Sequence, residues 1–295
     1  MRPRLGLVCI TSSEECRFRS VTRARVQAMT PEQQRLALLQ LYWDNLQRLH
    51  WVLTFCHRKA IRLYRATSAL FPLSDEPVGA AALESLAANL SSVGRRAERL
   101  GIRVVLHPDQ FVVLNSGSPK VVETSKLIMA KHGRAFDLLG LPRSTWSAMI
   151  LHGGKSGRSD ELVETIRGLS ENVRGRLVLE NDEYAYGAAE ILDVCRRAGV
   201  PMVFDAHHHV VKESLSDFED PSVRAFTEAA RGTWPDPGWQ MVHLSNGSEG
   251  FADRHHSELI AAIPSAFAAV PWIEVEARGK EIAIERLRRD WPIAE

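Results

Sequence analysis

The sequence predicts an α/β protein folded as a single (β/α)8 TIM barrel, and three observations support this. Short segments rich in β-branched and other apolar residues alternate along the chain with segments of helical spacing. Eight such segments fit into 295 residues, and strands separated by helices form parallel sheets. No G-x-G-x-x-G follows the first strand, which disfavours a doubly wound dinucleotide-binding sheet. We therefore expect one barrel domain spanning residues 1–295.

Strands and helices are expected to alternate in order along the chain. The expected strands lie at residues 4–10, 60–65, 102–107, 147–152, 176–181, 200–205, 239–245 and 272–277. The expected helices lie at residues 31–54, 80–100, 119–139, 159–173, 187–198 and 255–268. Thr30 is the expected N-cap of the first long helix, with Pro31 at its first position and Gln33 three residues after the cap. Gly101 and Gly199 are expected to end two later helices.

The composition is that of a globular chain with a large core. The sequence is 45% hydrophobic and 25% charged with a net charge of +1, so its overall charge neither requires nor excludes a polyanionic partner. Four scattered cysteines form no C-x-x-C pair, which predicts reduced thiols. No run approaches the ~18 apolar residues of a membrane helix, and the apolar run after Met1 is too short for a signal peptide. A cytoplasmic protein is expected.

Six of the expected strands carry a histidine or a carboxylate at their C-terminal end or within two residues of it. In a barrel these ends converge on one face, where active sites are built. Imidazole and carboxylate ligands together suit Mn²⁺, Zn²⁺ or Fe²⁺. With His208 and His256 added, these residues exceed what one four- to six-coordinate ion can use, so two or more metals about 3.5–4 Å apart are expected, an arrangement that serves phosphoester hydrolysis. The six residues are His107, His152, Glu180, Asp205, His243 and Glu276.

Further ligands are expected from two loops, one of which carries the triplet at residues 207–209. His208 follows Asp205 by three residues and is expected to reach a metal, whereas His207 and His209 flank it or pack outside. His256 is added from a later segment. For each residue taken alone a simpler interpretation stays open. A single strand-end histidine is more often a hydrogen-bonded core residue, and Glu276 has Arg278 or Lys280 as candidate ion-pair partners.

Seven motifs resemble those of the UV damage endonucleases and occur in the same order. They are LHPDQFVVLNSGSP, ILHGG, LENDE, VFDAHHH, VHLSNG, HHSELI and VEARGKE, and the resemblance runs through nearly the whole chain. These enzymes are ATP-independent repair nucleases with a TIM barrel related to endonuclease IV. They cut the phosphodiester immediately 5′ of a lesion. The resemblance implies the same metal ligands as the strand ends, with His208 and His256 included.

The resemblance also implies how damaged DNA is bound. Gln110 and Phe111 stand where the family inserts a glutamine and an aromatic residue into the duplex opposite the lesion. An apolar wedge of this kind compensates for unstacking, which is easier at a distorted base step. Lys155 and Asn115 are expected to contact DNA phosphates, and Lys280 is expected to act in catalysis with Glu180 and Glu276.

Three positions depart from the family pattern. Leu7 stands where the family has a first-strand tyrosine that contributes to lesion probing, and it is kept as an expected lesion-probing residue. Glu76 stands where the family has a histidine, and is kept as an expected metal ligand because a carboxylate also binds Mn²⁺. Met241 replaces a lysine two residues before His243.

The function expected from these observations is metal-assisted hydrolysis of damaged double-stranded DNA by a monomer. Its lesions would be cyclobutane dimers, 6-4 photoproducts and abasic sites. Its cofactors would be two or three divalent ions, with Mn²⁺ favoured, and it would need neither a nucleotide cofactor nor a membrane. Two alternatives stay open. One is a sugar isomerase or epimerase of the xylose-isomerase type, and the other is a catalytically silent barrel that binds lesions.

Overall fold

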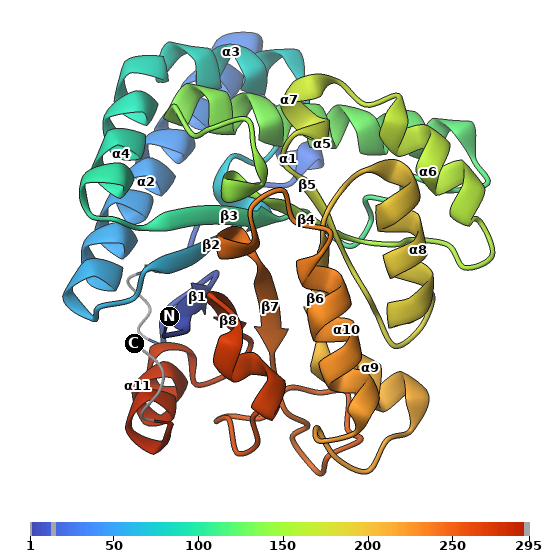
Figure 1. Cartoon of the computed structure of the whole chain (residues 1–295). Coiled ribbons are helices and arrows are strands. Elements are labelled where there is room, and N and C mark those ends of the chain that lie inside the picture. The colour runs from blue at the N-terminus through green and yellow to red at the C-terminus, as the bar shows by residue number, and fades with distance from the viewer. Residues whose placement is uncertain (1, 13–15, 292–295) are drawn as a thin grey trace.

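Eight parallel strands close a barrel in the computed structural model, which describes residues 2–12 and 16–291 (Figure 1). The strands pair in sequence order and β1 pairs with β8, so the predicted barrel is confirmed. The strands are β1 (Arg4–Val8), β2 (Leu63–Thr67), β3 (Arg103–His107), β4 (Met149–His152), β5 (Leu177–Glu180), β6 (Met202–Asp205), β7 (Met241–Leu244) and β8 (Trp272–Val275).

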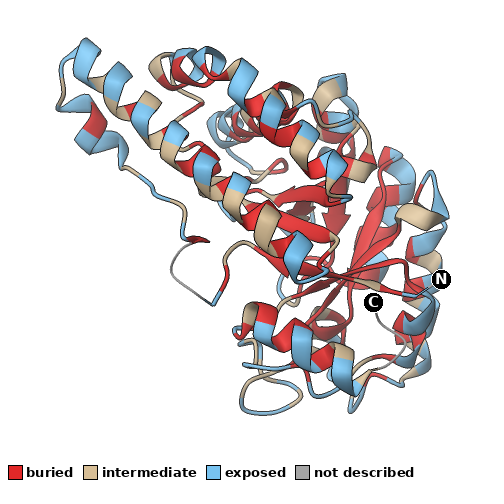
Figure 2. Ribbon diagram, turned by 90° about the vertical axis from the view of Figure 1, so that its left-hand side faces the viewer, coloured by how far each residue is buried: buried red, intermediate tan, exposed pale blue. Residues whose placement is uncertain are grey.

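Helices surround the barrel and bury one face each. Figure 2 shows strands that are almost wholly buried, and helices whose exposed residues face outward. The helices are α1 (Arg23–Gln27), α2 (Pro31–Arg58), α3 (Pro77–Ser85), α4 (Ala87–Arg99), α5 (Pro119–Leu139), α6 (Ser159–Arg167), α7 (Glu171–Arg174), α8 (Ala188–Ala198), α9 (Ala206–Glu213), α10 (Pro221–Arg231) and α11 (Lys280–Asp290). Short 3-10 turns cover Ser68–Leu70, Thr145–Ser147, Pro237–Trp239 and Ser265–Ala269.

The barrel interior is apolar in its lower part and polar at the C-terminal ends of the strands. Side chains that are two residues apart on a strand lie on the same face of the sheet. The residue two positions after an interior residue therefore also points into the barrel. Val178 packs in the interior cluster and Glu180 follows it. The same step from apolar to polar occurs at Leu63 and Arg65, Val105 and His107, Ile150 and His152, Val203 and Asp205, and Met241 and His243. The apolar layer therefore forms the floor beneath the polar cluster.

The helix signals were mostly confirmed. Thr30 caps α2 in a capping box with Gln33, and Gly199 ends α8 in the left-handed conformation. The helix expected at 119–139 has these bounds in α5, whereas the segments 80–100 and 159–173 are each divided into two helices.

The helix expected at 255–268 was wrong. The Asn246 side chain accepts hydrogen bonds from the backbone N–H of Ala261 (2.7 Å) and Ala262 (2.8 Å), and the Asn246 carbonyl accepts one from Ser257 (2.8 Å). These N–H groups are therefore unavailable to a helical ladder. The segment instead has one bridge between Gly247 and His256, is irregular as far as Pro264 and ends in the 3-10 turn Ser265–Ala269.

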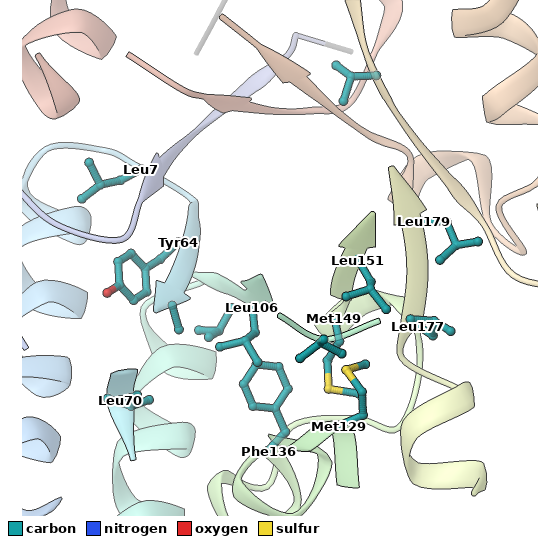
Figure 3. Packing of buried hydrophobic residues seen from close by; sticks show 14 of the residues in the cluster. Leu7, Tyr64, Leu70, Leu106, Met129, Phe136, Met149, Leu151, Leu177 and Leu179 are labelled. Atoms are coloured by element: carbon teal, nitrogen blue, oxygen red, sulfur yellow. The ribbon is translucent and has the colours of Figure 1, made fainter. Parts of the chain in front are cut away.

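Leu7 lies in the core and cannot probe DNA. Its side chain is fully buried and packs with the residues between the sheet and the helices, near Tyr64 (Figure 3). Adjacent strand residues point to opposite faces, so Gly6 faces the barrel interior and Leu7 faces the helices. The expectation that Leu7 contributes to lesion probing was therefore wrong.

Two smaller expectations concern thiols and membranes. Cys9, Cys16, Cys56 and Cys195 are all free, as expected. Within residues 2–12 and 16–291, no helix combines the length and apolar character that crossing a bilayer requires.

His132 on α5 gives a prediction for the pH dependence of stability. Burial and the nearby Lys131 charge lower the pKa of His132 to about 3, so the folded protein keeps the ring neutral at pH values where the unfolded chain binds a proton. Stability must then fall as the pH drops below about 6.5. In His132→Gln, the loss of unfolding free energy between pH 7 and pH 5 should be smaller by about 2 kcal/mol.

Urea unfolding at both pH values measures this difference, with His57→Gln, at an exposed position on α2, as the matched control. Identical pH dependence in His132→Gln and the native protein would contradict the prediction.

Candidate metal centre

Three groups of potential metal ligands meet at the C-terminal end of the barrel, and Glu180 belongs to all of them. Within each group the ligand atoms lie within 4.8 Å of one another. The groups are His107 with His152 and Glu180, Asp205 with His208 and Glu180, and His243 with Glu276 and Glu180. The structure thus brings together all six predicted strand-end residues and His208.

Glu180 is fully buried at the end of β5 and is surrounded by imidazoles. Its Oε1 lies 2.8 Å from His243 Nδ1, and its Oε2 lies 3.4 Å from His107 Nε2 and 3.8 Å from His152 Nε2. Burial alone would raise the pKa of Glu180, but the charges on His243 and His152 outweigh it and hold that pKa well below its usual value. Glu180 is therefore an anion at the centre of the cluster.

His208 reaches the centre because Asp205 caps helix α9. Asp205 Oδ1 accepts a hydrogen bond from the His208 backbone N–H (2.8 Å), which places His208 Nε2 3.7 Å from Glu180 Oε1. Glu183 lies 2.7 Å from His208 Nδ1 and fixes the other side of the ring. Burial opposes the charge on His208, yet Asp205 and Glu183 raise its pKa to about 10.

The other two histidines of the triplet point away from this centre. His207 Nδ1 lies 3.1 Å from the Ser245 hydroxyl. His209 contacts the Ser222 hydroxyl (2.9 Å) and packs against the Phe226 ring. His208 is therefore the member of the triplet that belongs to a group of potential ligands, and its role as a metal ligand stays a prediction.

Beneath His243 lies a buried ion pair that the sequence reasoning missed. Glu274 Oε2 is 2.8 Å from His243 Nε2 and 3.0 Å from Arg65 Nη1. Arg65 also pairs with Glu276, so one guanidinium holds two carboxylates. Burial opposes the charge of Arg65, but Glu276 and Glu274 outweigh it and raise its pKa well above the usual value. The spacing of two between Glu274 and Glu276 was the available signal, since it places both side chains on the interior face.

The donor set fits divalent cations. Glu180 Oε2 and Asp205 Oδ2 are buried oxygens with no hydrogen-bond partner, and such groups are costly unless a partner satisfies them. Carboxylates and imidazoles are also the ligands that Mn²⁺, Fe²⁺ and Zn²⁺ accept. His256 lies at the edge of this set, with Nδ1 3.9 Å from Glu276 Oε2.

Two expected site residues have other roles. Glu76 is the N-cap residue of α3 and pairs with Arg23, and it belongs to none of the three ligand groups found among the described residues. Asn115 is buried, accepts from the Lys155 N–H (2.9 Å) and donates to the Lys155 carbonyl (2.9 Å). The expectations of a metal ligand at Glu76 and a phosphate contact at Asn115 were wrong, because ion pairing and burial occupy these side chains.

Two cavities open beside the cluster. One of about 480 Å³ is lined by Glu180, Glu276 and Gln110, and the other of about 360 Å³ by Gln110, Lys155 and Tyr184. Both reach His107, His152 and His208. A larger cavity of about 560 Å³ lies at the opposite end of the barrel, near Arg4 and Trp272, and holds none of these ligands.

The predicted DNA-facing residues surround the same mouth. Phe111 is 64% exposed in the loop after β3, and Gln110 lines both cavities beside it. The Lys155 side chain is exposed in the loop after β4. Lys280 is half-buried at the start of α11 and interacts electrostatically with both Glu276 and Arg65. Burial lowers the pKa of Lys280.

Comparison with known proteins decides the family. The model of the family described as UV-endonuclease UvdE matches residues 3–295. The chain belongs to the UvdE family. Two proteins named UV DNA damage endonuclease, from Nostoc sp. and Deinococcus radiodurans, are each 52% identical to this UvdE chain. The alignments cover 98% of this chain and 91% of the Nostoc protein, and 97% of this chain and 95% of the Deinococcus protein.

Solved structures agree with the UvdE assignment. The crystal structure of SacUVDE superposes with a TM-score of 0.81 at 25% identity, covering 97% of this chain and 98% of that one. A D-tagatose 3-epimerase-like protein superposes with a TM-score of 0.58 at 10% identity, covering 99% of this chain and 97% of that one. This second likeness shows only that this chain and the epimerase-like protein share the barrel fold.

Proposed function

We propose that the protein is an ATP-independent repair endonuclease that nicks DNA immediately 5′ of UV photoproducts and at abasic sites. The observation that carries the proposal is the convergence of three ligand groups on Glu180 at the barrel mouth, in a chain of the UvdE family. Phosphoester hydrolysis is a reaction that closely spaced divalent ions catalyse, by stabilising both the attacking and the leaving oxygen.

Two or three divalent ions, with Mn²⁺ the favoured species, would be held by these groups and by His256. When bound, such ions acidify water and stabilise charge on the phosphate oxygens. Glu180 and Glu276 supply negative charge at the centre and orient the attacking water. Lys280 lies near Glu276 and stabilises negative charge on the scissile phosphate.

The protein's remaining residues bind and distort the duplex. Lys155 contacts a backbone phosphate, and its loop is held in place by Asn115 and by the Tyr186 hydroxyl, which donates to the Lys155 carbonyl (2.8 Å). Gln110 and Phe111 enter the duplex at the lesion, where unstacking is easiest. Affinity therefore comes from phosphate contacts, and selectivity from the ease of deforming the damaged site.

The proposal is tested with a labelled duplex that carries one cyclobutane dimer, and with an undamaged duplex beside it. A nick directly 5′ of the dimer is expected with Mn²⁺ and should disappear after chelation and dialysis. Undiminished nicking by the metal-free protein would exclude the metal-assisted reaction. Binding of the dimer without a nick under any divalent ion would instead identify a silent lesion-binding barrel.

Phe111→Ala should weaken selective binding of the damaged duplex. The inserted ring compensates for the unstacking of bases at the lesion. Its removal should lower the ratio of the affinity for damaged DNA to that for undamaged DNA by about 10-fold, because about 1–2 kcal/mol of stacking free energy is lost. Fluorescence anisotropy measures both affinities, and metal content should not change. Leu127→Ala removes a similarly exposed apolar side chain from α5 (52% exposed) and is the control. An unchanged affinity ratio in Phe111→Ala would remove Phe111 from the lesion-probing set.

A further inference from the structure

Tyr184 is an exposed aromatic residue beside the metal centre that neither the sequence motifs nor the proposed mechanism uses. Its exposed fraction is 69%, and that of Phe111 is 64%, the two largest values for large apolar side chains in the described part of the chain. Both side chains project from loops that follow barrel strands, Phe111 after β3 and Tyr184 after β5. The two rings therefore belong to the rim of the same barrel mouth.

The turn that carries Tyr184 is fixed by hydrogen bonds to the buried side chain of Asp182. The buried Asp182 carboxylate accepts hydrogen bonds from the backbone N–H of Tyr184 (2.7 Å) and of Tyr186 (3.3 Å). The Asp182 N–H donates to the Tyr186 carbonyl (2.8 Å). Tyr186 itself is fully buried, and its hydroxyl donates to the Lys155 carbonyl (2.8 Å). A ring presented by a fixed turn loses little conformational entropy when it binds a ligand.

The surroundings of Tyr184 suit a nucleotide. Its side chain lines the 360 Å³ cavity that also contains Gln110 and Lys155. The Arg254 guanidinium carbon lies 5.0 Å from the centroid of the Tyr184 ring, and Lys212 Nζ donates to the Tyr184 carbonyl (3.4 Å). An aromatic face with adjacent cations is the pattern that binds unpaired bases together with their phosphates.

Arg254 has no carboxylate partner among the described residues. The neighbouring Asp253 carboxylate is occupied by the backbone N–H groups of His255 (3.1 Å) and Glu249 (3.0 Å). The Arg254 charge is thus available to an anion from outside, while its contact with Tyr184 keeps the guanidinium on the ring.

We propose that Tyr184 and Arg254 together bind one nucleotide of the DNA strand that crosses the rim, the ring by stacking on an unpaired base or its sugar and the guanidinium by pairing with the adjacent phosphate. This inference rests on the proposed function. It assigns the rim after β5 to DNA binding and not to catalysis, so the metal ligands are left unchanged by it.

The experiment compares Tyr184→Ala, Tyr184→Phe and Arg254→Gln with the native protein on the dimer duplex. Tyr184→Ala should raise the Kd about 5- to 150-fold, the range that corresponds to loss of one base–aromatic stack. Tyr184→Phe should bind as the native protein does, because the ring and not the hydroxyl makes the contact. Arg254→Gln should weaken binding to damaged and undamaged duplexes alike and should reduce the slope of log K against log salt by about one.

Two variants on other surfaces serve as matched controls. Leu127→Ala removes an exposed apolar side chain from α5, and Arg289→Gln removes an exposed cation from the last turn of α11. A Kd for Tyr184→Ala within twofold of the native value, while native binding and nicking stay dimer-selective, would overturn this inference alone. A native protein that neither binds nor nicks the dimer duplex would overturn the proposed function and this inference with it.

Discussion

Glu180→Gln should reduce the rate of dimer-dependent nicking about 1,000-fold, which corresponds to about 4 kcal/mol of lost transition-state stabilisation. Glu180 is the member common to all three ligand groups, so the substitution removes one negative charge from every candidate metal position. The amide cannot replace that charge, although it keeps the shape of the side chain. The loss should therefore appear in both the rate and the metal content.

Two measurements separate the metal effect from misfolding. Metal content per protein, determined after gel filtration in Mn²⁺, should fall in Glu180→Gln, whereas the circular dichroism spectrum should match that of the native protein. Glu164→Gln changes a carboxylate on α6 that is 73% exposed in its side chain and should retain native activity. Native metal content together with a native nicking rate in Glu180→Gln would contradict the central role of this residue.

The sequence predicted which residues gather at the candidate metal centre because most of them lie at or beside the C-terminal end of a strand. His107, His152 and Glu180 could be placed from local information, since β-rich segments are short and a barrel brings their C-terminal ends together. Asp205 and His208 were predictable for the same reason, as a strand end followed by a helix cap. What local spacing could not reveal was which polar residues the barrel buries beneath that surface.

Arg65 and Glu274 are two such buried polar residues. They are 209 positions apart in the sequence and meet only because β8 closes the barrel beside β1 and thus near β2. The helix expected at 255–268 was wrong for a similar reason, since the backbone N–H groups of Ala261 and Ala262 donate to the side chain of Asn246, outside the segment, and not to a helical ladder. Such tertiary contacts outweigh local propensity, and the spacing of two that places Glu274 on the interior face does not identify Arg65 as its partner.

Arg65→Met should destabilise the metal-free protein by about 3–5 kcal/mol, the usual result of removing one partner from a buried ion pair. The side chain of Glu274 is fully buried and that of Glu276 is 12% exposed. Without the guanidinium, two carboxylates are left in the barrel interior with His243 as their remaining common cation. Urea unfolding in chelator measures this loss.

The double variant Arg65→Met/Glu274→Gln distinguishes this charge effect from a packing defect. Neutralising Glu274 removes one of the uncompensated charges, so the double variant should be more stable than the sum of the two single effects predicts. The coupling should exceed about 1 kcal/mol, because contacting charges are not additive. The affinity for Mn²⁺ should still fall about 10- to 100-fold. A carboxylate that accepts a hydrogen bond from a metal-binding histidine orients its ring, and the double variant lacks this carboxylate at position 274. Additive single effects, with native Mn²⁺ affinity in the double variant, would show that the pair fills space and does not position His243.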